Sequence, residues 1–291
     1  MESLINKIFF LPLRVRIKLI QLFRKLSRNT RILPDFVIIG AMKCGTSSLI
    51  NYLTQHPYIK IPLFQKEVHF FDRNFDKGIN WYRSFFPSRI YKYIFTKIKK
   101  RNFLTGEKSP LYIFHPLVPK RLYKTLPNSK IILLLRNPVN RAYSHYNHSV
   151  RNGRDKLTFE EAIKLEPERL KGEKNKILKF KNYRSIKYSS YSYLSRGHYL
   201  EQIKEWRRYF PKQQILIIKS EDLFKTPQVV MNKVYDFLNI PRFKHQKFKK
   251  IFSRTYQKMN EETKQELVKY FKPYNEKLYE YLNENFGWEE E

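Results

Sequence analysis

Short apolar runs alternate with segments of helical spacing along most of this chain. The apolar runs lie at 36–39, 131–135 and 215–218. The helical patterns lie around 46–55, 116–126, 138–150, 198–209 and 226–238. Continuous apolar runs separated by helical segments are typical of buried parallel strands joined by crossover helices. The pattern therefore predicts an α/β fold with a central, mainly parallel sheet flanked by helices.

The first 33 residues have a different pattern. Val15, Leu19, Leu22, Phe23 and Leu26 recur at helical spacing among basic residues, which predicts a basic amphipathic helix. The apolar run 8–13 is too short to span a bilayer, and no small-residue cleavage site follows it. Such a helix either lies on an anionic membrane surface or packs on protein. We expect a cytoplasmic protein, with residues 1–30 as its candidate peripheral membrane contact and residues 34–291 as one domain.

Composition narrows the classes of partner. The chain has 291 residues, 42% of them hydrophobic, and a formal net charge of +32, which attracts polyanions. It carries no zinc-finger, homeodomain or RNA-recognition signature, so we expect no nucleic-acid partner. Cys44 is the single cysteine, which excludes an intrachain disulfide and a cysteine-based metal site.

The stretch DFVIIGAMKCGTSS, residues 35–48, predicts a strand, a loop and the start of a helix. Gly40 and Gly45 bound the loop. In such a loop, backbone N–H groups and the helix N-terminus converge on an anion, and glycines allow close approach of a phosphate. The alternative is that the two glycines make only a tight turn between strand and helix.

The loop differs from that of ATP-binding proteins in the place of its lysine. Thr46 occupies the usual lysine position, and Lys43 lies inside the loop instead. The apolar run 131–135 ends in Arg136, where a nucleoside triphosphatase would have a metal-binding Asp. These residues predict a phosphate site without magnesium, and they disfavour the alternative of a P-loop nucleotide kinase.

A second phosphate site is predicted after the run 131–135. Arg136 follows the strand, Pro138 begins a helix, and Ser144 lies two turns into that helix. The planar guanidinium of Arg136 and the hydroxyl of Ser144 could both reach a phosphate. Two phosphate sites imply a nucleotide with phosphates on two sides of its ribose.

Candidate acid–base groups lie in KEVHFFD, residues 66–72. Glu67 and His69 share one face of an extended chain, and burial against Phe70 and Phe71 is expected to raise the pKa of Glu67 toward the range of a general base. The alternative is a solvated Glu beside a packed aromatic pair. Lys108 follows a possible strand at 102–105, near a strand end where ligands of α/β sheets bind, although its segment alone reads as an ordinary turn.

Taken together, these motifs resemble the PAPS-dependent sulfotransferases, and within them the branch of heparan sulfate and related carbohydrate sulfotransferases. PAPS is 3′-phosphoadenosine 5′-phosphosulfate. The resemblance covers about residues 34–288, which implies a sulfotransferase domain over 34–291 with a P-loop-type three-layer fold. It rests on DFVIIGAMKCGTSSL (35–49), KEVHFFD (66–72), KGINWY (77–82), GEKSPLY (106–112), IILLLRNPVNRAYSHYNH (131–148) and the block 197–241.

The resemblance assigns roles to residues at matching positions. It implies that Lys43 stabilises charge on the bridging oxygen as the leaving group departs, that Glu67 is the catalytic base, and that His69, Asp72 and Lys108 line the reacting centre, with Asp72 and Lys108 toward the acceptor. The cofactor-binding residues that it implies are Lys43, Cys44, Gly45, Thr46, Ser47 and Ser48 for the 5′-phosphosulfate, Arg136 and Ser144 for the 3′-phosphate, and Arg254 and Tyr256 for the 3′-phosphate or adenine pocket.

The expected reaction is therefore sulfuryl transfer from PAPS to a hydroxyl of a saccharide, glycolipid or other small acceptor, with PAP as product and no metal. The chain lacks the late cysteine pair of many secreted heparan-type members and a Golgi-type anchor, so neither a heparan acceptor nor a Golgi location is implied. Acceptor contacts are expected from loops such as 73–100 and 151–196. Two alternatives remain, a P-loop nucleotide kinase and a non-enzymatic module that binds polyanions or membrane.

Overall fold

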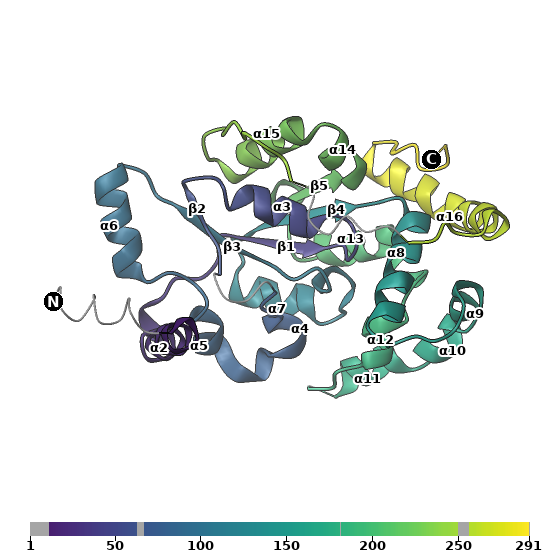
Figure 1. Ribbon diagram of the computed structural model, residues 1–291, viewed down its shortest axis with the longest axis horizontal. Coiled ribbons are helices and arrows are strands. Elements are labelled where there is room, and N and C mark those ends of the chain that lie inside the picture. The colour runs from purple at the N-terminus through teal and green to yellow at the C-terminus, as the bar shows by residue number, and fades with distance from the viewer. Residues whose placement is uncertain (1–11, 63–66, 181, 250–255, 291) are drawn as a thin grey trace.

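Five parallel strands form the centre of the protein in the computed structural model, which describes residues 12–62, 67–180, 182–249 and 256–290. The order across the sheet is β2-β3-β1-β4-β5 (Figure 1). The bounds are Phe36–Gly40 for β1, Ile59–Lys60 for β2, Leu104–Lys108 for β3, Lys130–Leu135 for β4 and Ile215–Lys219 for β5. The predicted α/β fold with a parallel sheet is confirmed.

Helices cover both faces of this sheet. Figure 1 shows α3, α14 and α15 on one side of it and α4 and α7 on the other. The helices are α2 (Leu13–Leu26), α3 (Thr46–Leu53), α4 (Phe70–Arg73), α5 (Gly78–Arg83), α6 (Arg89–Lys99), α7 (Val118–Thr125), α8 (Pro138–Arg151), α9 (Phe159–Lys164), α10 (Glu166–Leu170), α11 (Glu173–Lys179), α12 (Ile186–Ser190), α13 (Tyr199–Arg207), α14 (Ser220–Lys225), α15 (Pro227–Leu238) and α16 (Glu261–Leu282). Within the described ranges, no helix is both long and apolar enough to cross a bilayer.

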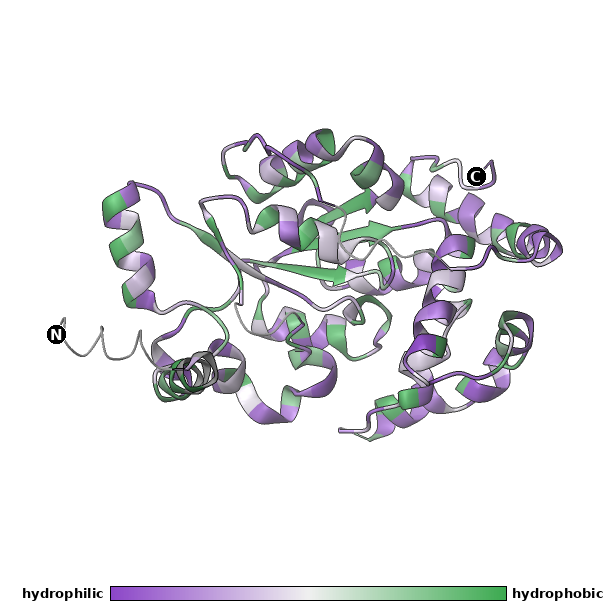
Figure 2. Cartoon of the chain, viewed as in Figure 1, coloured by the Kyte–Doolittle hydropathy of each residue, from purple (hydrophilic) through white to green (hydrophobic). Residues whose placement is uncertain are grey.

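The core lies around the two central strands. Every residue of β1 is buried, as are the last five of β4, because helices exclude water from both sheet faces. Figure 2 shows this as green strands inside a more polar exterior. Gly106 of β3 lies opposite Phe36 of β1, and a Cβ atom there would come within 2.3 Å of the Phe36 ring. Glycine at this position therefore allows the ring to pack between the two strands.

The predicted strands and crossover helices are present with shifts of a few residues at their ends. The strand expected at 102–105 is β3, which begins and ends later than expected. It pairs with β1 through residues 106–108 and ends at Lys108. The N-terminal amphipathic helix is α2. Sequence reasoning did not predict β2, the short helices between residues 70 and 99, or α16.

Candidate functional site

The predicted motifs meet where the parallel strands end. Gly40 ends β1, Lys108 ends β3, and Arg136 directly follows β4. The carboxyl ends of parallel strands lie at one edge of a sheet, which is where ligands of open α/β folds bind. Segments far apart in the sequence therefore supply side chains to one site.

The loop after β1 adopts the backbone expected of a phosphate-binding loop. Lys43 and Gly45 have left-handed conformations, with φ of 72° and 84°. A Cβ atom on Gly45 would lie 3.0 Å from the Phe224 ring. The helix α3 begins directly afterwards at Thr46, so the positive end of its dipole faces the loop.

Other elements hold this loop through its carbonyl oxygens. Ser220 Oγ, at the start of α14, donates to the Cys44 oxygen at 3.0 Å, and Arg136 Nη1 donates to the Lys43 oxygen at 3.3 Å. The Cys44 side chain is fully buried, and burial raises the pKa of its thiol to about 11. Cys44 is therefore a neutral packing residue, and only its main chain can contribute to phosphate binding.

One chain of polar contacts joins this loop to the candidate base. Lys108 Nζ lies 3.0 Å from Ser47 Oγ and 3.0 Å from Glu67 Oε1. The other oxygen of Glu67, Oε2, lies 2.9 Å from His69 Nε2. The second ring nitrogen of His69, Nδ1, lies 2.9 Å from Asp72 Oδ2. The structure thus brings together Glu67, His69, Asp72 and Lys108, four of the five residues predicted around the reacting centre.

The predicted rise in the pKa of Glu67 is wrong. Burial alone would raise the pKa, but the hydrogen bond from His69 and the charge and hydrogen bond of Lys108 outweigh it and lower the pKa to about 2. The aromatic neighbours in the sequence correctly indicated burial. They could not indicate two cationic partners, one of which comes from β3.

His69 is a cation at neutral pH. Burial would lower its pKa, but the hydrogen bonds to Asp72 and Glu67 raise it to about 9, so both ring nitrogens carry protons and donate to carboxylates. Its backbone is left-handed, with φ of 51°, and its N–H donates to Ser109 Oγ at 3.1 Å. The residue is therefore fixed at both its backbone and its ring.

Glu107 is buried next to these residues and was not predicted as a site residue from the sequence. Its carboxylate is 2% exposed and accepts hydrogen bonds from Tyr82, Ser109 and Tyr112 at 2.7, 2.9 and 3.1 Å. The Tyr112 hydroxyl in turn accepts from the N–H groups of Phe70 and Phe71, the first residues of α4.

Through these partners, Glu107 fixes the backbone that carries His69 and Asp72. Burial raises the pKa of Glu107 to about 7 despite its three hydrogen bonds. One sequence signal could have identified Glu107: it is an acidic residue at a buried position of a strand, where acidic residues are rare unless they are paired.

Comparison with known families decides what this arrangement is. The family model described as the sulfotransferase domain matches residues 33–280, most of the chain. The chain belongs to the sulfotransferase family. This assignment displaces the alternatives of a nucleotide kinase and of a non-enzymatic binding module.

Several relatives of this sulfotransferase are similar over most of its length. It is 31% identical to membrane-associated sulfotransferase kil1 of Dictyostelium discoideum, over 88% of this chain and 67% of that protein. It is 29% identical to human heparan sulfate glucosamine 3-O-sulfotransferase 3A1, over 91% of this chain and 64% of that protein. The chain thus spans about two thirds of the length of these relatives. A solved sulfotransferase from Alicyclobacillus acidocaldarius has 31% identity and a TM-score of 0.65, with 89% of this chain and 100% of that one covered.

Of the residues predicted to bind a second phosphate, Arg136 contacts the loop, and the others lie on or near α8 or outside the described residues. Ser144 is buried on α8, whose start is fixed by Asn137, which accepts hydrogen bonds from the N–H groups of its first turn. Tyr256 is 42% exposed, and its ring centroid lies 5.6 Å from that of Tyr143, the residue before Ser144. Arg254 falls outside the described residues. The roles of these residues in binding stay predictions.

Members of this family use PAPS, and the loop of this sulfotransferase fits such an anionic group. The loop contains one cation, Lys43, and two others, Lys108 and Arg136, contact it from the ends of neighbouring strands. The positive end of the α3 helix dipole adds to this charge. Among the described residues, no group of His, Cys, Asp and Glu side chains is arranged to hold a metal ion.

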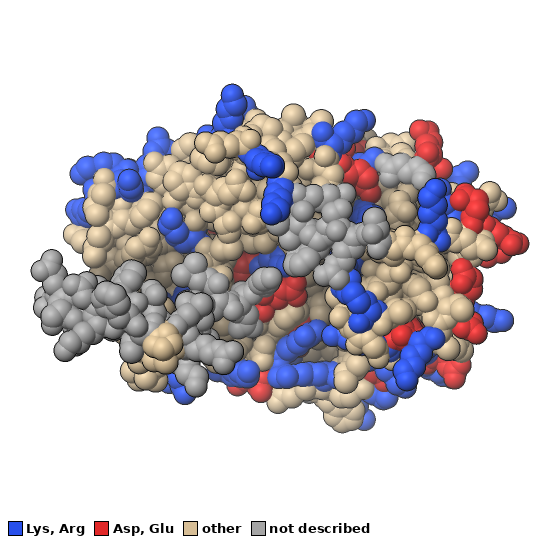
Figure 3. Space-filling model, in the orientation of Figure 1, with Lys and Arg blue, Asp and Glu red and all other residues tan. Residues whose placement is uncertain are grey.

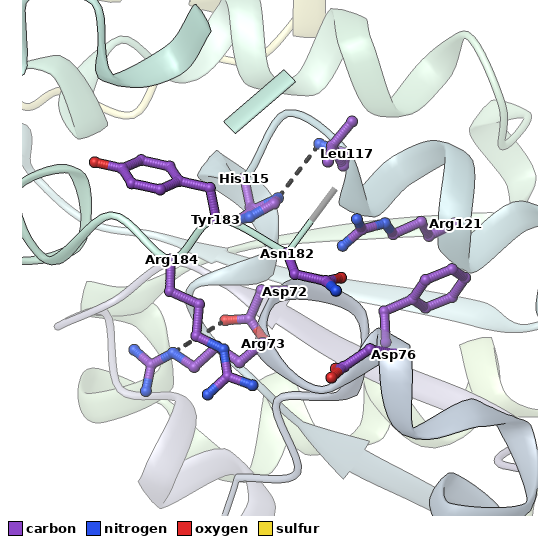
Figure 4. A pocket seen from close by; sticks show the side chains of 10 residues that line it. Asp72, Arg73, Asp76, His115, Leu117, Arg121, Asn182, Tyr183 and Arg184 are labelled. Atoms are coloured by element: carbon purple, nitrogen blue, oxygen red, sulfur yellow. Dashed lines mark hydrogen bonds and ion pairs between the residues drawn. The ribbon is translucent and has the colours of Figure 1, made fainter. Parts of the chain in front are cut away.

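A small polar pocket adjoins the polar contacts of Glu67, His69 and Asp72 (Figure 4). Arg73, Arg121 and Arg184 line it, and Asp76 is the second carboxylate among its residues. The pocket is lined in full by Asp72, Arg73, Phe75, Asp76, His115, Leu117, Arg121, Asn182, Tyr183 and Arg184. These residues include members of both loops from which acceptor contacts were expected, 73–100 and 151–196.

Proposed function

We propose that this protein transfers the sulfuryl group of PAPS to a hydroxyl of a saccharide or glycolipid, with Glu67 as general base. The observation that carries the proposal is the position of Lys108 Nζ, 3.0 Å from Ser47 of the phosphate loop and 3.0 Å from Glu67. One lysine thus touches both the donor-binding loop and the candidate base. Such proximity is what an in-line transfer between two bound groups requires.

On the donor side, the loop residues 43–48 would hold the 5′-phosphosulfate, and Arg136 with Ser144 would hold the 3′-phosphate. PAPS supplies an activated sulfuryl group bonded to a phosphate oxygen. Lys43 would stabilise the negative charge that develops on this bridging oxygen as the S–O bond breaks, because a fixed cation lowers the energy of a developing anion. PAP then leaves with that oxygen.

On the acceptor side, Glu67 would accept the hydroxyl proton as the acceptor oxygen bonds to sulfur. With a pKa of about 2, Glu67 is ionised and can accept a proton, whereas His69, with a pKa of about 9, is already protonated at neutral pH. Lys108, which lowers the pKa of Glu67, also contacts Ser47 of the donor loop, so one cation lies between the base and the phosphosulfate site.

The acceptor class is supported by relatives named as heparan sulfate sulfotransferases, whereas the pocket in Figure 4, of about 10 Å³, has room for about one water molecule. Asp72 links the pocket to the base, since its Oδ2 contacts His69 and it also lines the pocket. Burial lowers the pKa of His115 to about 4, so this pocket residue is neutral.

The decisive experiment compares the native protein with Glu67→Gln in a transfer assay with radiolabelled PAPS and a panel of glycans, glycolipids and small alcohols. Loss of the base should reduce the transfer rate about 100-fold or more, the usual contribution of a general base. PAP affinity, measured by calorimetry, should stay within about twofold. Glu276→Gln, an exposed change on α16, is the matched control.

Two results would contradict the proposal. If Glu67→Gln transfers at the native rate, Glu67 is not the base. If PAP fails to bind at physiological salt while Mg-ATP binds, the loop does not recognise a 3′-phosphorylated nucleotide. A location at a membrane through the N-terminal segment stays a prediction alongside this function.

A further inference from the structure

Helix α2 directs its apolar stripe toward solvent. Leu22, Phe23 and Leu26 are 53%, 65% and 77% exposed, and Val15 and Leu19 on the same stripe are each 40% exposed. An amphipathic helix on a globular domain normally buries this face. In α2 a basic side chain faces the protein instead.

Arg24 is that basic side chain. Its Nη2 donates to the Phe85 carbonyl oxygen, and burial lowers its pKa to about 10, with the charge of Arg31 adding to the effect. At neutral pH the guanidinium is still protonated. Arg24 thus attaches α2 by a polar contact on its inner side. The Arg31 guanidinium lies 5.9 Å from the centroid of the Phe23 ring, yet Phe23 and the rest of the stripe stay at least 40% exposed.

Helix α6 has the same arrangement. Ile90, Tyr93, Ile94 and Ile98 are between 48% and 70% exposed, and none of the residues of α6, all of which the structure describes, is buried. The opposite side of the helix packs through Phe95, whose ring centroid lies 5.2 Å from that of Phe103. The exposed residues therefore form an outer apolar stripe on a helix that is already attached by its inner face.

The two helices lie at the same end of the molecule. Arg31, just after α2, forms a β-bridge with Ser88, the N-cap of α6, and its Nη1 donates to the Phe86 carbonyl oxygen at 2.7 Å. Ile32 N–H donates to the Pro87 carbonyl oxygen at 3.0 Å. Figure 1 shows α2 and α6 at the end that carries the N-terminus, opposite α16.

The segments that carry these helices are strongly basic. Residues 12–34 and 77–106 together contain fifteen Lys and Arg and no Asp or Glu, although the whole chain has 26 acidic residues. One acidic residue from outside these segments, Asp35, lies 3.8 Å from Lys92 of α6. On the face seen in Figure 3, blue side chains surround the surface at the α6 end, whereas the red ones gather toward the middle and the opposite end. Exposed apolar residues within a strongly basic surface match the headgroup region of an anionic bilayer.

We infer that α2 and α6 form one face that docks on anionic lipid bilayers. We call it the lipid-docking face and define it by the exposed apolar residues of the two helices, Val15, Leu19, Leu22, Phe23, Leu26, Ile90, Tyr93, Ile94 and Ile98. These side chains enter the boundary between headgroups and acyl chains, and the surrounding Lys and Arg contact lipid phosphates. Two helices provide more area than one, which is what stable peripheral binding requires.

The charge argues against a second copy of the chain as the occupant. Two such faces brought together would bring two strongly basic segments against one another, since neither segment contains an acidic residue. Like charges at close range repel, most strongly at low salt. An anionic bilayer supplies the opposite charge. This inference does not depend on which acceptor receives the sulfuryl group.

The test is cosedimentation of the full chain with vesicles of phosphatidylcholine alone or of equimolar phosphatidylcholine and phosphatidylserine. The native protein should bind the anionic vesicles, and binding should weaken as salt rises. A variant carrying Ile90→Ser, Ile94→Ser and Ile98→Ser should bind at least about 10-fold more weakly, because it loses most of the apolar contact of α6.

A second variant, Leu22→Ser with Leu26→Ser, tests α2 separately and should also bind about 10-fold more weakly. The matched control combines Leu178→Ser, Ile186→Ser and Val229→Ser, which are 50%, 72% and 55% exposed but lie outside the lipid-docking face. The control should bind vesicles like the native protein. Near-native PAP affinity of all variants would show that they are folded.

Each other outcome overturns the inference. Equal binding to both kinds of vesicle, or no binding to either, removes the anionic bilayer as the partner. Native-like binding by the α6 variant removes α6 from the face. If light scattering shows a dimer of the native protein that the same substitutions dissociate, the face is a contact between copies of the chain. Failure of the proposed function alone would instead appear as lost PAP binding with vesicle binding intact.

Discussion

Replacing Glu107 with Gln should remove a defined part of the pH dependence of stability. Burial raises the pKa of this carboxyl from 4.5 to about 7 in the folded protein. A group whose pKa is raised on folding contributes stability that is fully present below pH 4.5 and is lost as the pH rises through about 7. At about 1.36 kcal/mol per pKa unit, this rise corresponds to a loss of roughly 3 kcal/mol.

The substitution keeps most of the local contacts. The Gln side-chain oxygen can accept from Tyr82 and Tyr112, as Glu107 Oε1 does at 2.7 and 3.1 Å. The new amide NH₂ can donate to Ser109 Oγ, reversing the present hydrogen bond of 2.9 Å. Glu107→Gln therefore removes the titration without leaving three hydroxyl groups unpaired, which Glu107→Ala would do.

The assay is urea unfolding of the native protein and Glu107→Gln at several pH values between about 4 and 8, with free energies from linear extrapolation. All other titrating groups are shared, so the difference between the two curves isolates Glu107. That difference should change by about 3 kcal/mol in favour of the variant as the pH rises. Parallel curves would refute the argument that burial controls this carboxyl, and Glu276→Gln should leave the pH dependence unchanged.

Two further substitutions test the phosphate loop. Gly45→Ala should cost about 1–2 kcal/mol of stability, because φ is 84° and the new Cβ would lie 3.0 Å from the Phe224 ring. The resulting shift of the loop should weaken PAP binding in calorimetry; native affinity would show that this loop conformation is not needed for binding. Lys43→Ala should slow transfer and weaken PAPS binding in steady-state assays, since a cation at the leaving oxygen contributes to both; an unchanged kcat/KM would show that Lys43 faces elsewhere.

The sheet and its crossover helices were predictable because a strand that is buried on both faces is an uninterrupted apolar run in the sequence. The run 131–135 is apolar without interruption, and it became the fully buried part of β4. The long helix α16 left a weaker signal, since Pro273 lies inside it and proline normally argues against a helix interior. The short helices near residues 70–99 depend on tertiary contacts rather than on a repeating apolar pattern.

The sequence was sufficient to predict which residues meet around Glu67, but not the pKa values that they have there. Glu67 and His69 are neighbours in the sequence, and their contact followed from spacing. The pKa of Glu67 depends also on Lys108, 41 residues away, whose approach is set by the pairing of β3 with β1. The support from Glu107 depends on Tyr82 and Tyr112, which meet only in the folded protein.

The hydrogen bond from Ser220 to the Cys44 oxygen sets the order in which the site can be completed during synthesis. The two residues are 176 positions apart, and β5 must add to the sheet before Ser220 reaches the loop. At roughly 5–20 residues per second, a ribosome takes about 9–35 s to cover that interval. The phosphate loop is thus among the first parts of the chain to be made and among the last to acquire its final shape.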